Sequence, residues 1–492
     1  MQPESPASPV LACWGGKPSS VAIAGGGLAG LAAACALAEA GFRVTLFERR
    51  PYLGGRASSY EHPGTGEIVD NCQHVLLGCC TNLIDFYRRT GVDGKIRWYD
   101  KLTFLEPGGR VSVIAPSALP APLHTAPAFL RAACLNFSDK LAISRAMMAL
   151  APALPVDRGE TFLDWLKRHG QTAQAIERFW KTILVSALNE DLDQVSVPYA
   201  AQVIRESFLK SAAAGRMGVP TVPLTELYGA AGDYVRARGG EIQSRASVES
   251  FRDQGPAVGV VIGGQELRFD YLVLAVSFDT LARILPDTPE AAPLAAALGQ
   301  LTSSPITGIH LWFDREISEL DHAVLLDRTI QWMFHKSRLI TALHPSKPKP
   351  GSLGAPAREK GIGSYVELVV SCSRSLVEKS KAEIVELASR EMWEFFPAAR
   401  TANLLKSTVI KEINATYSPR PGVDRFRPSP TTVWPRVFLG GDWTATGWPA
   451  TMEGAVRSGY LAAESLAAAA GMRGKRFLAP DLSARGLMRL FA

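Results

Sequence analysis

The sequence predicts an α/β fold in which a parallel sheet covered by helices is interleaved with a second, α+β domain built on a mixed sheet. Two observations carry this prediction. A short apolar strand, a glycine-rich turn, an alanine-rich helix and a second strand follow one another over residues 21–56. A second strand–glycine–helix unit occupies residues 437–469, and helical and strand-like patterns alternate between the two units.

The first unit carries the G-x-G-x-x-G pattern of a dinucleotide-binding turn. Gly25 permits the tight turn, Gly27 lets the backbone approach a pyrophosphate, and Gly30 lets the helix pack closely on the strand. The helix that follows, beginning at Leu28 and Ala29, offers free N–H groups and a partial positive charge to the phosphates. The pattern therefore predicts a Rossmann-like dinucleotide site.

The second strand of this unit ends at Glu48, 23 residues after the first glycine, where an acid that binds a ribose is expected. Arg49 follows it, and a short loop then reaches Gly55 and Arg56. An arginine on a glycine-flanked loop can reach the same pyrophosphate, because its planar guanidinium matches paired phosphate oxygens. We expect these four residues to bind the cofactor.

The spacing E-x5-G-G-R, which begins at Glu48, resembles the superfamily of FAD-binding amine oxidases, phytoene desaturases and protoporphyrinogen oxidases. The resemblance implies that FAD is the cofactor, with Glu48 on the adenosine ribose and Arg56 near the pyrophosphate. It also implies that a strand predicted over residues 241–248 brings its end, at Val248, against the adenine.

A matching half-site is predicted near the carboxyl end. An apolar strand runs into Gly441 and Asp442, and a carboxylate at that position can hold a ribityl or phosphate-linked hydroxyl. A helix then begins at Thr451, with Met452 and Ala455 in its first turn. Its positive end would face the flavin N1–C2 carbonyl and stabilise the negative charge of a reduced flavin.

In the superfamily's order, three segments build the FAD-binding domain and two build the substrate domain. The expected segments are 18–97, 215–277 and 430–472 for the FAD-binding domain, 98–214 and 278–429 for the substrate domain, and 473–492 for a carboxy-terminal tail. Within them we expect a buried parallel strand over 269–276, a helix over 377–396 and a loop over 344–363.

Composition limits the partners. The net charge is +6, and no lysine or arginine cluster alternates with aromatic residues, so nucleic acid is not expected. Seven scattered cysteines without C-x-x-C spacing predict reduced thiols and no metal centre, which favours the cytoplasm. No uncharged apolar run reaches the length of a membrane-spanning helix, and the first residues lack the pattern of a secretory signal.

Residues 116–150 form an apolar, proline-interrupted stretch that includes a helix predicted over 138–150. One interpretation is a helix buried in the core of the substrate domain. The alternative is an apolar rim that docks on a bilayer, with Arg131, Lys140 and Arg145 meeting the headgroups. In that case the protein is peripheral on the inner face of the cytoplasmic membrane.

Three stretches, at residues 70–80, 188–189 and 447–455, look like one branch of the superfamily, the squalene-associated FAD-dependent desaturases. These are the hydroxysqualene dehydroxylases of hopanoid biosynthesis. The resemblance implies reduction of the long-chain isoprenoid hydroxysqualene to squalene with loss of water. It also implies an external reductant, either NAD(P)H or a reductase, although the sequence carries no second dinucleotide fingerprint.

This chemistry needs a general acid to protonate the hydroxyl, and a dry apolar cavity to keep water from the carbocation. The candidates for the acid or a polar anchor are His74 and Asp70, with Tyr417 as a third. Two alternatives stay open. A phytoene or carotenoid desaturase moves hydride from substrate to flavin, and a non-enzymatic isoprenoid carrier of the GDP-dissociation-inhibitor type resembles this fold but uses no FAD.

Overall fold

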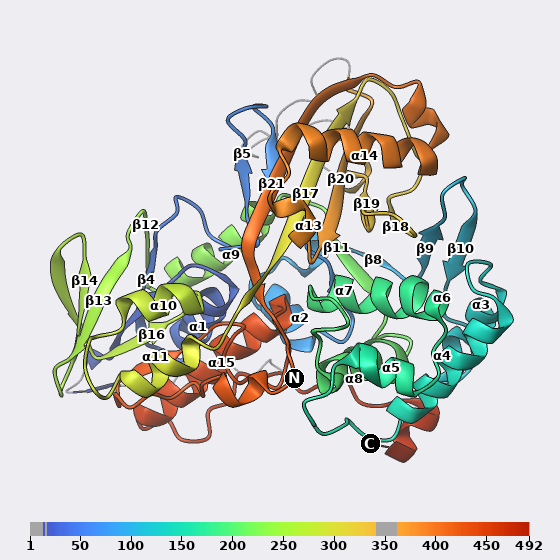
Figure 1. Cartoon of the computed structure of the whole chain (residues 1–492). Coiled ribbons are helices and arrows are strands. Elements are labelled where there is room, and N and C mark those ends of the chain that lie inside the picture. The colour runs from blue at the N-terminus through green and yellow to red at the C-terminus, as the bar shows by residue number, and fades with distance from the viewer. Residues whose placement is uncertain (1–12, 15–16, 341–361, 492) are drawn as a thin grey trace, which may run out of the picture.

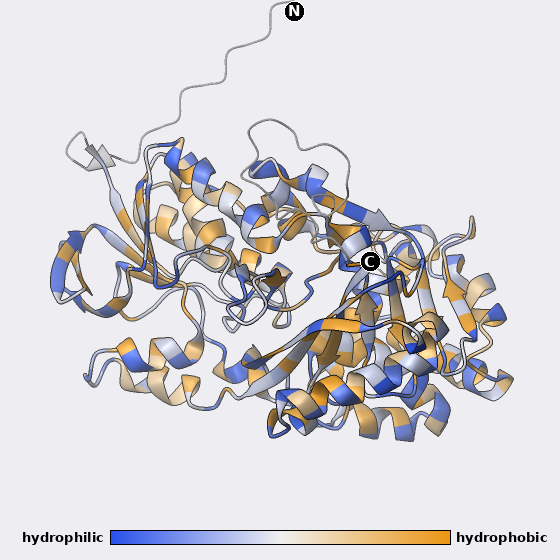
Figure 2. Ribbon diagram, turned by 90° about the horizontal axis from the view of Figure 1, so that it is seen from above, coloured by the Kyte–Doolittle hydropathy of each residue, from blue (hydrophilic) through white to orange (hydrophobic). Residues whose placement is uncertain are grey.

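A computed structural model describes residues 13–14, 17–340 and 362–491 of the chain. Figure 1 shows one part with a parallel sheet, a second part with a sheet of long strands, and a layer of short helices beside that second sheet. We name the two parts the nucleotide-binding side and the substrate side, after the roles expected from the sequence. Strands of both large sheets carry hydrophobic residues along much of their length (Figure 2). The predicted α/β fold with a mixed sheet is confirmed, whereas the loop expected over 344–363 lies almost entirely outside the described residues.

The nucleotide-binding side is built on a five-stranded parallel sheet whose strands come from three distant stretches of the chain. The sheet order is β12-β4-β3-β16-β22, with bounds β12 (Glu241–Ser244), β4 (Arg43–Glu48), β3 (Ser20–Ala24), β16 (Tyr271–Leu274) and β22 (Val437–Leu439). The two central strands β3 and β16 are buried along their whole length and almost wholly apolar, as expected for parallel strands covered on both faces. The buried parallel strand expected within 269–276 is therefore confirmed as β16.

Helices α1 (Leu28–Glu39), α9 (Leu224–Arg236) and α15 (Met452–Ala469) pack together on this sheet. The approach of α1 and α15 is very close, since a Cβ at Gly459 would lie 2.2 Å from the carbonyl oxygen of Ala29. The two ends of the sequence that carry the predicted half-sites therefore pack against each other.

The strand predicted over 241–248 is two strands. Arg245 adopts a left-handed conformation with φ of 58°, which ends β12 at Ser244. Val248 begins the next strand, in an antiparallel three-stranded sheet. Its strands are β13 (Val248–Asp253), β14 (Val258–Ile262) and β15 (Gln265–Phe269).

The substrate side is built on a seven-stranded mixed sheet. Its order is β10-β9-β18-β19-β20-β17-β21, with bounds β10 (Val111–Ile114), β9 (Leu102–Leu105), β18 (His322–Leu325), β19 (Trp332–Phe334), β20 (Ser364–Ser371), β17 (Ser303–Phe313) and β21 (Leu404–Tyr417). All neighbours are antiparallel except β18 and β9, which are parallel.

The helix predicted over 377–396 is present but begins four residues later, at Lys381. Helix α13 (Arg374–Val377) ends early, and Ser380 starts α14 (Lys381–Phe395) through a capping box with Glu383. The apolar side of α14 covers one face of the seven-stranded sheet. The other face lies against the loop that follows β6, since a Cβ at Gly308 of β17 would lie 3.5 Å from the carbonyl oxygen of Asn71.

A helical layer completes the substrate side. Its members are α3 (Ala126–Arg131), α4 (Phe137–Leu150), α5 (Phe162–Arg168), α6 (Ala173–Ala175), the π-helical η3 (Ile176–Lys181), α7 (Thr182–Leu188), α8 (Val197–Ile204) and the π-helical η4 (Arg205–Leu209). Among the described residues, no helix is both long enough and apolar enough to cross a bilayer. The domain boundaries expected from the sequence stay predictions.

Short elements connect these parts. They are β1 (Cys13–Trp14), β2 (Lys17–Pro18), β5 (Ser59–Glu61), β6 (Ile68–Asp70), β7 (Leu76–Leu77), α2 (Thr81–Arg89), η1 (Asp93–Lys95), β8 (Ile96–Tyr99), η2 (Leu123–Thr125), β11 (Met217–Pro220), α10 (Phe278–Ile284), α11 (Ala292–Leu298), α12 (Lys336–Leu339), η6 (Pro397–Arg400), η7 (Val423–Phe426) and η8 (Gly486–Phe491). Strand β6 leads directly into the loop that carries His74.

Candidate active site

Two glycine-rich loops lie side by side at the end of β3. The Gly54 N–H donates to the carbonyl of Gly26 at 2.9 Å, and Gly27 pairs with Gly54 as an isolated bridge. A Cβ at Gly30 would lie only 1.9 Å from the Gly25 oxygen, and one at Gly55 would lie 2.9 Å from the Gly27 Cα. Side chains are therefore excluded at Gly30 and Gly55, and the contact of these loops with a pyrophosphate stays a prediction.

The amino terminus of α1 is open to an anion. Its N-cap is Gly27, which has no side chain to occupy the first N–H groups, and its first turn contains no acidic residue. The N–H groups of Leu28, Ala29 and Gly30 precede the first intrahelical donor, which is Leu31. This arrangement fits a pyrophosphate, which needs several donors and no competing carboxylate.

Glu48 lies at the rim of the same loops and is only 6% exposed. One carboxylate oxygen accepts from the Gly26 N–H at 2.6 Å and the other from the Arg50 N–H at 2.7 Å. Ala246, two residues before Val248, donates to the Glu48 carbonyl at 2.9 Å. The residues expected at ribose and adenine thus lie together, while Arg49 next to them is exposed.

The carboxy-terminal half-site meets the first one through an ion pair. A guanidinium nitrogen of Arg56 lies 2.7 Å from Oδ1 of Asp442, and the same side chain donates to the carbonyl of Ala415. Asp442 is buried at the end of β22. At Gly441, with φ of 147°, a Cβ would lie 2.2 Å from Nε1 of Trp443.

The amino terminus of α15 faces the same region with its acidic residue turned away. Thr451 caps the helix by accepting from the Gly454 N–H at 3.0 Å, and Ala455 follows in the first turn. The carboxylate of Glu453 instead accepts from the Leu83 N–H at 2.8 Å, at the start of α2. The sulfur of Met452 accepts from a tyrosine hydroxyl at 3.3 Å. The positive end of α15 therefore stays available to an electron-rich group.

The loop that carries His74 is tied to Arg56. The side-chain amide of Asn71 donates to the Arg56 carbonyl and to a carboxylate oxygen of Glu412, both at 3.1 Å. The backbone of Gly308, on β17, lies directly beneath this loop, because a Cβ there would approach the Asn71 oxygen to 3.5 Å. The loop thus lies between the cofactor half-sites and the seven-stranded sheet.

Sequence reasoning missed two charged residues beneath this loop, Lys336 and Glu367. Nζ of Lys336 lies 2.5 Å from Oδ2 of Asp70, 2.8 Å from Oε1 of Gln73 and 3.4 Å from Oε2 of Glu367. These three charged side chains are at most 4% exposed. No local signal marks Lys336, which lies in a mostly apolar stretch 266 positions from Asp70.

This ion pair decides the protonation of the two buried carboxyl groups. Burial alone would raise the pKa of Asp70, but the Lys336 ammonium and the Ser59 hydroxyl hold it below its usual range. Burial raises the pKa of Glu367 to about 7, and the negative charge of Asp70 also raises it. The Lys336 ammonium lowers this pKa, but it lies farther from Glu367 than from Asp70. Asp70 is therefore an anionic anchor, whereas Glu367 keeps a proton up to neutral pH.

His74 is half-buried, and its Nδ1 lies 2.6 Å from the Cys72 carbonyl. A carbonyl can only accept, so Nδ1 carries the proton and Nε2 of the neutral ring is an acceptor. Burial lowers the pKa of His74, which favours this neutral form. The geometry suits a proton acceptor better than the proton donor expected from the sequence.

Tyr417 belongs to a separate network. Its hydroxyl is buried and donates to the Tyr199 hydroxyl at 3.1 Å, and the guanidinium of Arg427 lies 5.0 Å from the centre of its ring. Burial raises the pKa of Tyr417. The hydrogen bonds of its hydroxyl thus do not join those of Asp70 and His74.

An apolar cluster borders the His74 loop. Trp332 and Phe334 of β19 stack with ring centres 5.5 Å apart, and Cys72 belongs to the same cluster. Other members are Met217, Val219, Leu339, Val369, Val75, Leu77, Tyr99, Leu102 and Ile306. Phe334 is buried in this cluster and Trp332 is half-buried, so this side of the loop is bordered by apolar side chains that exclude water.

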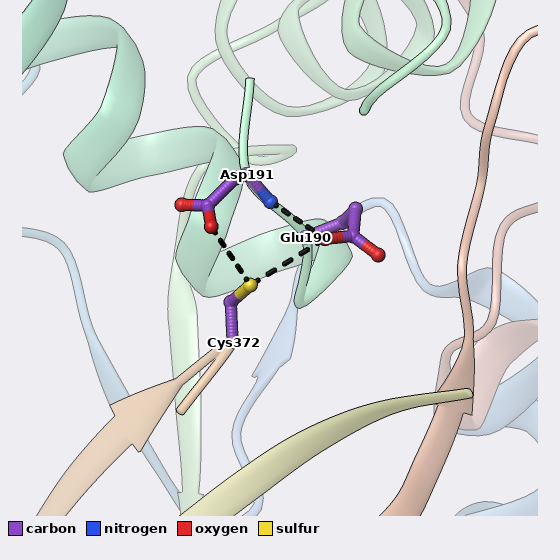
Figure 3. Close-up of side chains that lie close together, drawn as sticks. All are labelled: Glu190, Asp191 and Cys372. Carbon is purple, nitrogen blue, oxygen red and sulfur yellow. Dashed lines mark hydrogen bonds between the residues drawn. The ribbon is translucent and has the colours of Figure 1, made fainter. Parts of the chain in front are cut away.

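A second polar cluster joins Glu190, Asp191 and Cys372, whose potential ligand atoms lie within 4.8 Å of one another (Figure 3). The thiol donates to Asp191 at 3.2 Å and to Glu190 at 3.4 Å, and burial with these carboxylates raises its pKa to about 12. Arg374 already donates to Glu190 at 2.5 and 2.8 Å. Because a guanidinium supplies the positive charge here, we assign no metal to this cluster.

Residues 28–467 match the family described as flavin containing amine oxidoreductase. The chain is also similar to two curated proteins of Synechococcus elongatus. It is 27% identical to a 15-cis-phytoene desaturase, covering 91% of this chain and 96% of that protein. It is 26% identical to a probable zeta-carotene desaturase, covering 91% of this chain and 98% of that protein.

Solved structures resemble the whole fold at low sequence identity. An oxidoreductase from Methanosarcina mazei matches with a TM-score of 0.66 and 18% identity, covering 89% of this chain and 98% of its own. Cyclohexylamine oxidase from Brevibacterium oxydans matches with a TM-score of 0.64 and 17% identity, covering 92% of this chain and 99% of its own. At such identity these likenesses establish the shared fold.

Proposed function

The chain belongs to the flavin containing amine oxidoreductase family and its cofactor is FAD, and on this premise we propose that it dehydrogenates a long-chain polyene isoprenoid. The two glycine loops, the open end of α1 and the Arg56–Asp442 pair fit that cofactor. A carrier that uses no FAD, the last alternative left open by the sequence, does not agree with this premise. Location in the cytoplasm, with a lipid surface as partner, remains part of the proposal.

The observation that carries this proposal is His74 beside an apolar cluster. Bound FAD supplies a hydride acceptor to such a reaction. Desaturation also removes a proton from the substrate, and the free Nε2 of His74 is poised to accept one. The half-buried Trp332 would contact the chain, and the apolar cluster behind it would keep water out. The similarity to two polyene desaturases over nearly the whole chain supports the same choice.

Reduction of hydroxysqualene to squalene is the second candidate, and Glu367 favours it. This reaction runs hydride toward the substrate and needs a proton for the departing water. A carboxyl with a pKa of about 7 carries such a proton near neutral pH. An external reductant, NAD(P)H or a reductase, would then be required. This candidate rests on the resemblance of residues 70–80 to the hydroxysqualene dehydroxylases.

Direction of hydride transfer separates the two candidates. Oxidised protein is mixed anaerobically with phytoene or zeta-carotene in detergent, and dithionite-reduced protein is mixed with hydroxysqualene. Loss of the oxidised flavin absorbance with a more unsaturated product supports desaturation. Return of that absorbance with squalene as product replaces our first choice by the second. A flavoprotein inert to both classes of lipid would overturn the isoprenoid proposal.

A further inference from the structure

The helix α4 is apolar on two opposite sides. Ala142, Ile143, Ala146 and Leu150 are buried against the helical layer. Phe137, Leu141 and Met148 point the other way and are 79%, 42% and 66% exposed. Their spacing of four and seven residues places them in one narrow stripe. A helix buried on all sides has no exposed apolar stripe. The interpretation of α4 as a core helix therefore accounts for its buried side but not for its exposed apolar side.

Exposed apolar residues gather in this part of the molecule. Of the twenty large apolar side chains exposed in the described residues, thirteen lie in 111–156 or 487–491. Near the stripe, Leu119, Leu123 and Leu130 belong to the chain that leads into and through α3. The end of α3 lies beside α4, since Nζ of Lys140 donates to the carbonyl of Leu130 at 2.8 Å, and gathered exposed apolar side chains mark an interaction site.

The carboxy-terminal turn η8 joins this surface. Its Leu487 N–H donates to the carbonyl of Ala121 at 2.8 Å, two residues before Leu123. Met488 is buried and anchors the turn, while Leu487 and Leu490 are 47% and 78% exposed. Figure 1 shows this end of the chain beside the helical layer that contains α4. Two distant segments therefore present apolar side chains in the same region.

Within residues 110–150 the charge that reaches solvent has a single sign, although Arg110 is paired with Glu106. Between residues 110 and 150 the chain has one acid, Asp139, and it is buried at the start of α4. The charged side chains that reach solvent in this range are Arg110, Arg131, Lys140 and Arg145. Lys140 and Arg145 lie on either side of the stripe, and Arg489 adds a further cation on η8. Such a surface repels a second copy of itself and attracts an anionic one.

We propose that α4, with the turn η8, is a docking face for an anionic lipid bilayer. Phe137, Leu141 and Met148 insert below the headgroups, and Lys140 and Arg145 contact the phosphates. This inference rests on the proposed function only for its purpose, which is to bring the active site to a membrane that holds the hydrocarbon substrate. Its physical basis is the exposed stripe and its flanking charges.

Vesicle flotation of the full-length holoprotein tests this docking face. We expect the protein to float with vesicles of phosphatidylcholine mixed with phosphatidylglycerol, and to float less with phosphatidylcholine alone or in high salt. A triple variant with Phe137→Ser, Leu141→Ser and Met148→Ser should reduce partitioning at least about tenfold. Lys140→Glu with Arg145→Glu should reduce it about fivefold per charge on the mixed vesicles.

A matched control changes exposed apolar residues elsewhere, with Leu267→Ser, Leu405→Ser and Val433→Ser, and should float as the native protein does. Equal flotation of the α4 triple variant would overturn the proposal. So would a dimer in light scattering that the α4 variant abolishes, since the stripe would then be an interface between copies. Turnover in detergent is measured on the same samples: floating protein without polyene turnover overturns the proposed function and leaves the docking face standing.

Discussion

Nζ of Lys336 lies 2.5 Å from Oδ2 of Asp70, and neither side chain is more than 4% exposed. The pair joins the last residue of β6 to the first residue of α12, which packs beside β20 of the seven-stranded sheet. A buried ion pair is costly to break from one side, because the remaining charge stays in a low-dielectric interior. The two sides of the active-site region are therefore coupled through one ammonium group.

Lys336→Met should lower the free energy of unfolding by about 3–5 kcal/mol, since Asp70 would be left charged and buried. The double variant Lys336→Met with Asp70→Asn should recover part of this loss, because no uncompensated charge remains. Chemical denaturation of the flavin-loaded proteins measures both. Lys379→Met, at an exposed position, is the control and should change stability by less than about 0.5 kcal/mol. Equal losses for the single and double variants would show that the pair is not coupled.

Glu367 predicts a specific pH dependence of stability. Its pKa rises from 4.5 to about 7 on folding, so the folded protein binds this proton more tightly than the unfolded chain does. The stabilisation is complete below about pH 4.5 and is lost as pH rises through about 7. Between these limits, native protein should lose on the order of 3 kcal/mol relative to Glu367→Gln. If the free energy of unfolding depended on pH in the same way in both proteins across this range, the raised pKa of Glu367 would be contradicted.

The sequence predicted what depends on local pattern. The glycine turn, Glu48 and the α15 amino terminus each have a signature that spans a few residues, and the structure forms the turn, the strand end and the helix start at these positions. The cofactor contacts expected of them stay predictions. The two half-sites could be paired because the superfamily's order places them together. Arg56 was expected at the pyrophosphate, but its contact with Asp442 depends on a separation of 386 positions that no periodicity encodes.

The missed features have different physical causes. Lys336 and Glu367 are charged residues in the core, where buried charges are not expected from the sequence. Their burial is stabilised by pairing with residues that are distant in the sequence. No local pattern indicates the backbone partner of His74, the Cys72 carbonyl, which fixes the tautomer of the neutral ring. The acid role expected for His74 stays a prediction. The strand predicted over 241–248 is divided at Arg245, which adopts a left-handed backbone conformation. This conformation is uncommon for arginine, so the sequence does not indicate it.

Gly30→Ala should abolish flavin binding. The new methyl group would lie 1.9 Å from the Gly25 carbonyl oxygen, so the turn that approaches the pyrophosphate must open. The ratio of flavin to protein absorbance after purification measures the loss. Gly229→Ala, on α9 where no heavy atom lies within 4 Å of the new Cβ, should retain full flavin content. Stoichiometric flavin in the Gly30 variant would refute the assigned position of the pyrophosphate.

Arg56 and Asp442 should act together on cofactor affinity. Arg56→Lys keeps the positive charge but loses the planar fork, so the carbonyl of Ala415 and the Asp442 carboxylate can no longer both be held. Asp442→Asn leaves the shape of the cleft and weakens a charge-assisted hydrogen bond, which is worth about 1.5–3 kcal/mol. Each change should therefore raise the dissociation constant for FAD by about ten- to a hundredfold.

Titration of the apoprotein with FAD, followed by quenching of flavin fluorescence, measures these constants. Arg43→Lys, an exposed change at the opposite end of β4, should bind FAD as the native protein does. The double variant should bind only slightly more weakly than either single one, because both substitutions remove the same contact. Additive losses would mean that the two residues contact FAD independently, and the ion pair that joins the two half-sites would then have no part in holding the cofactor.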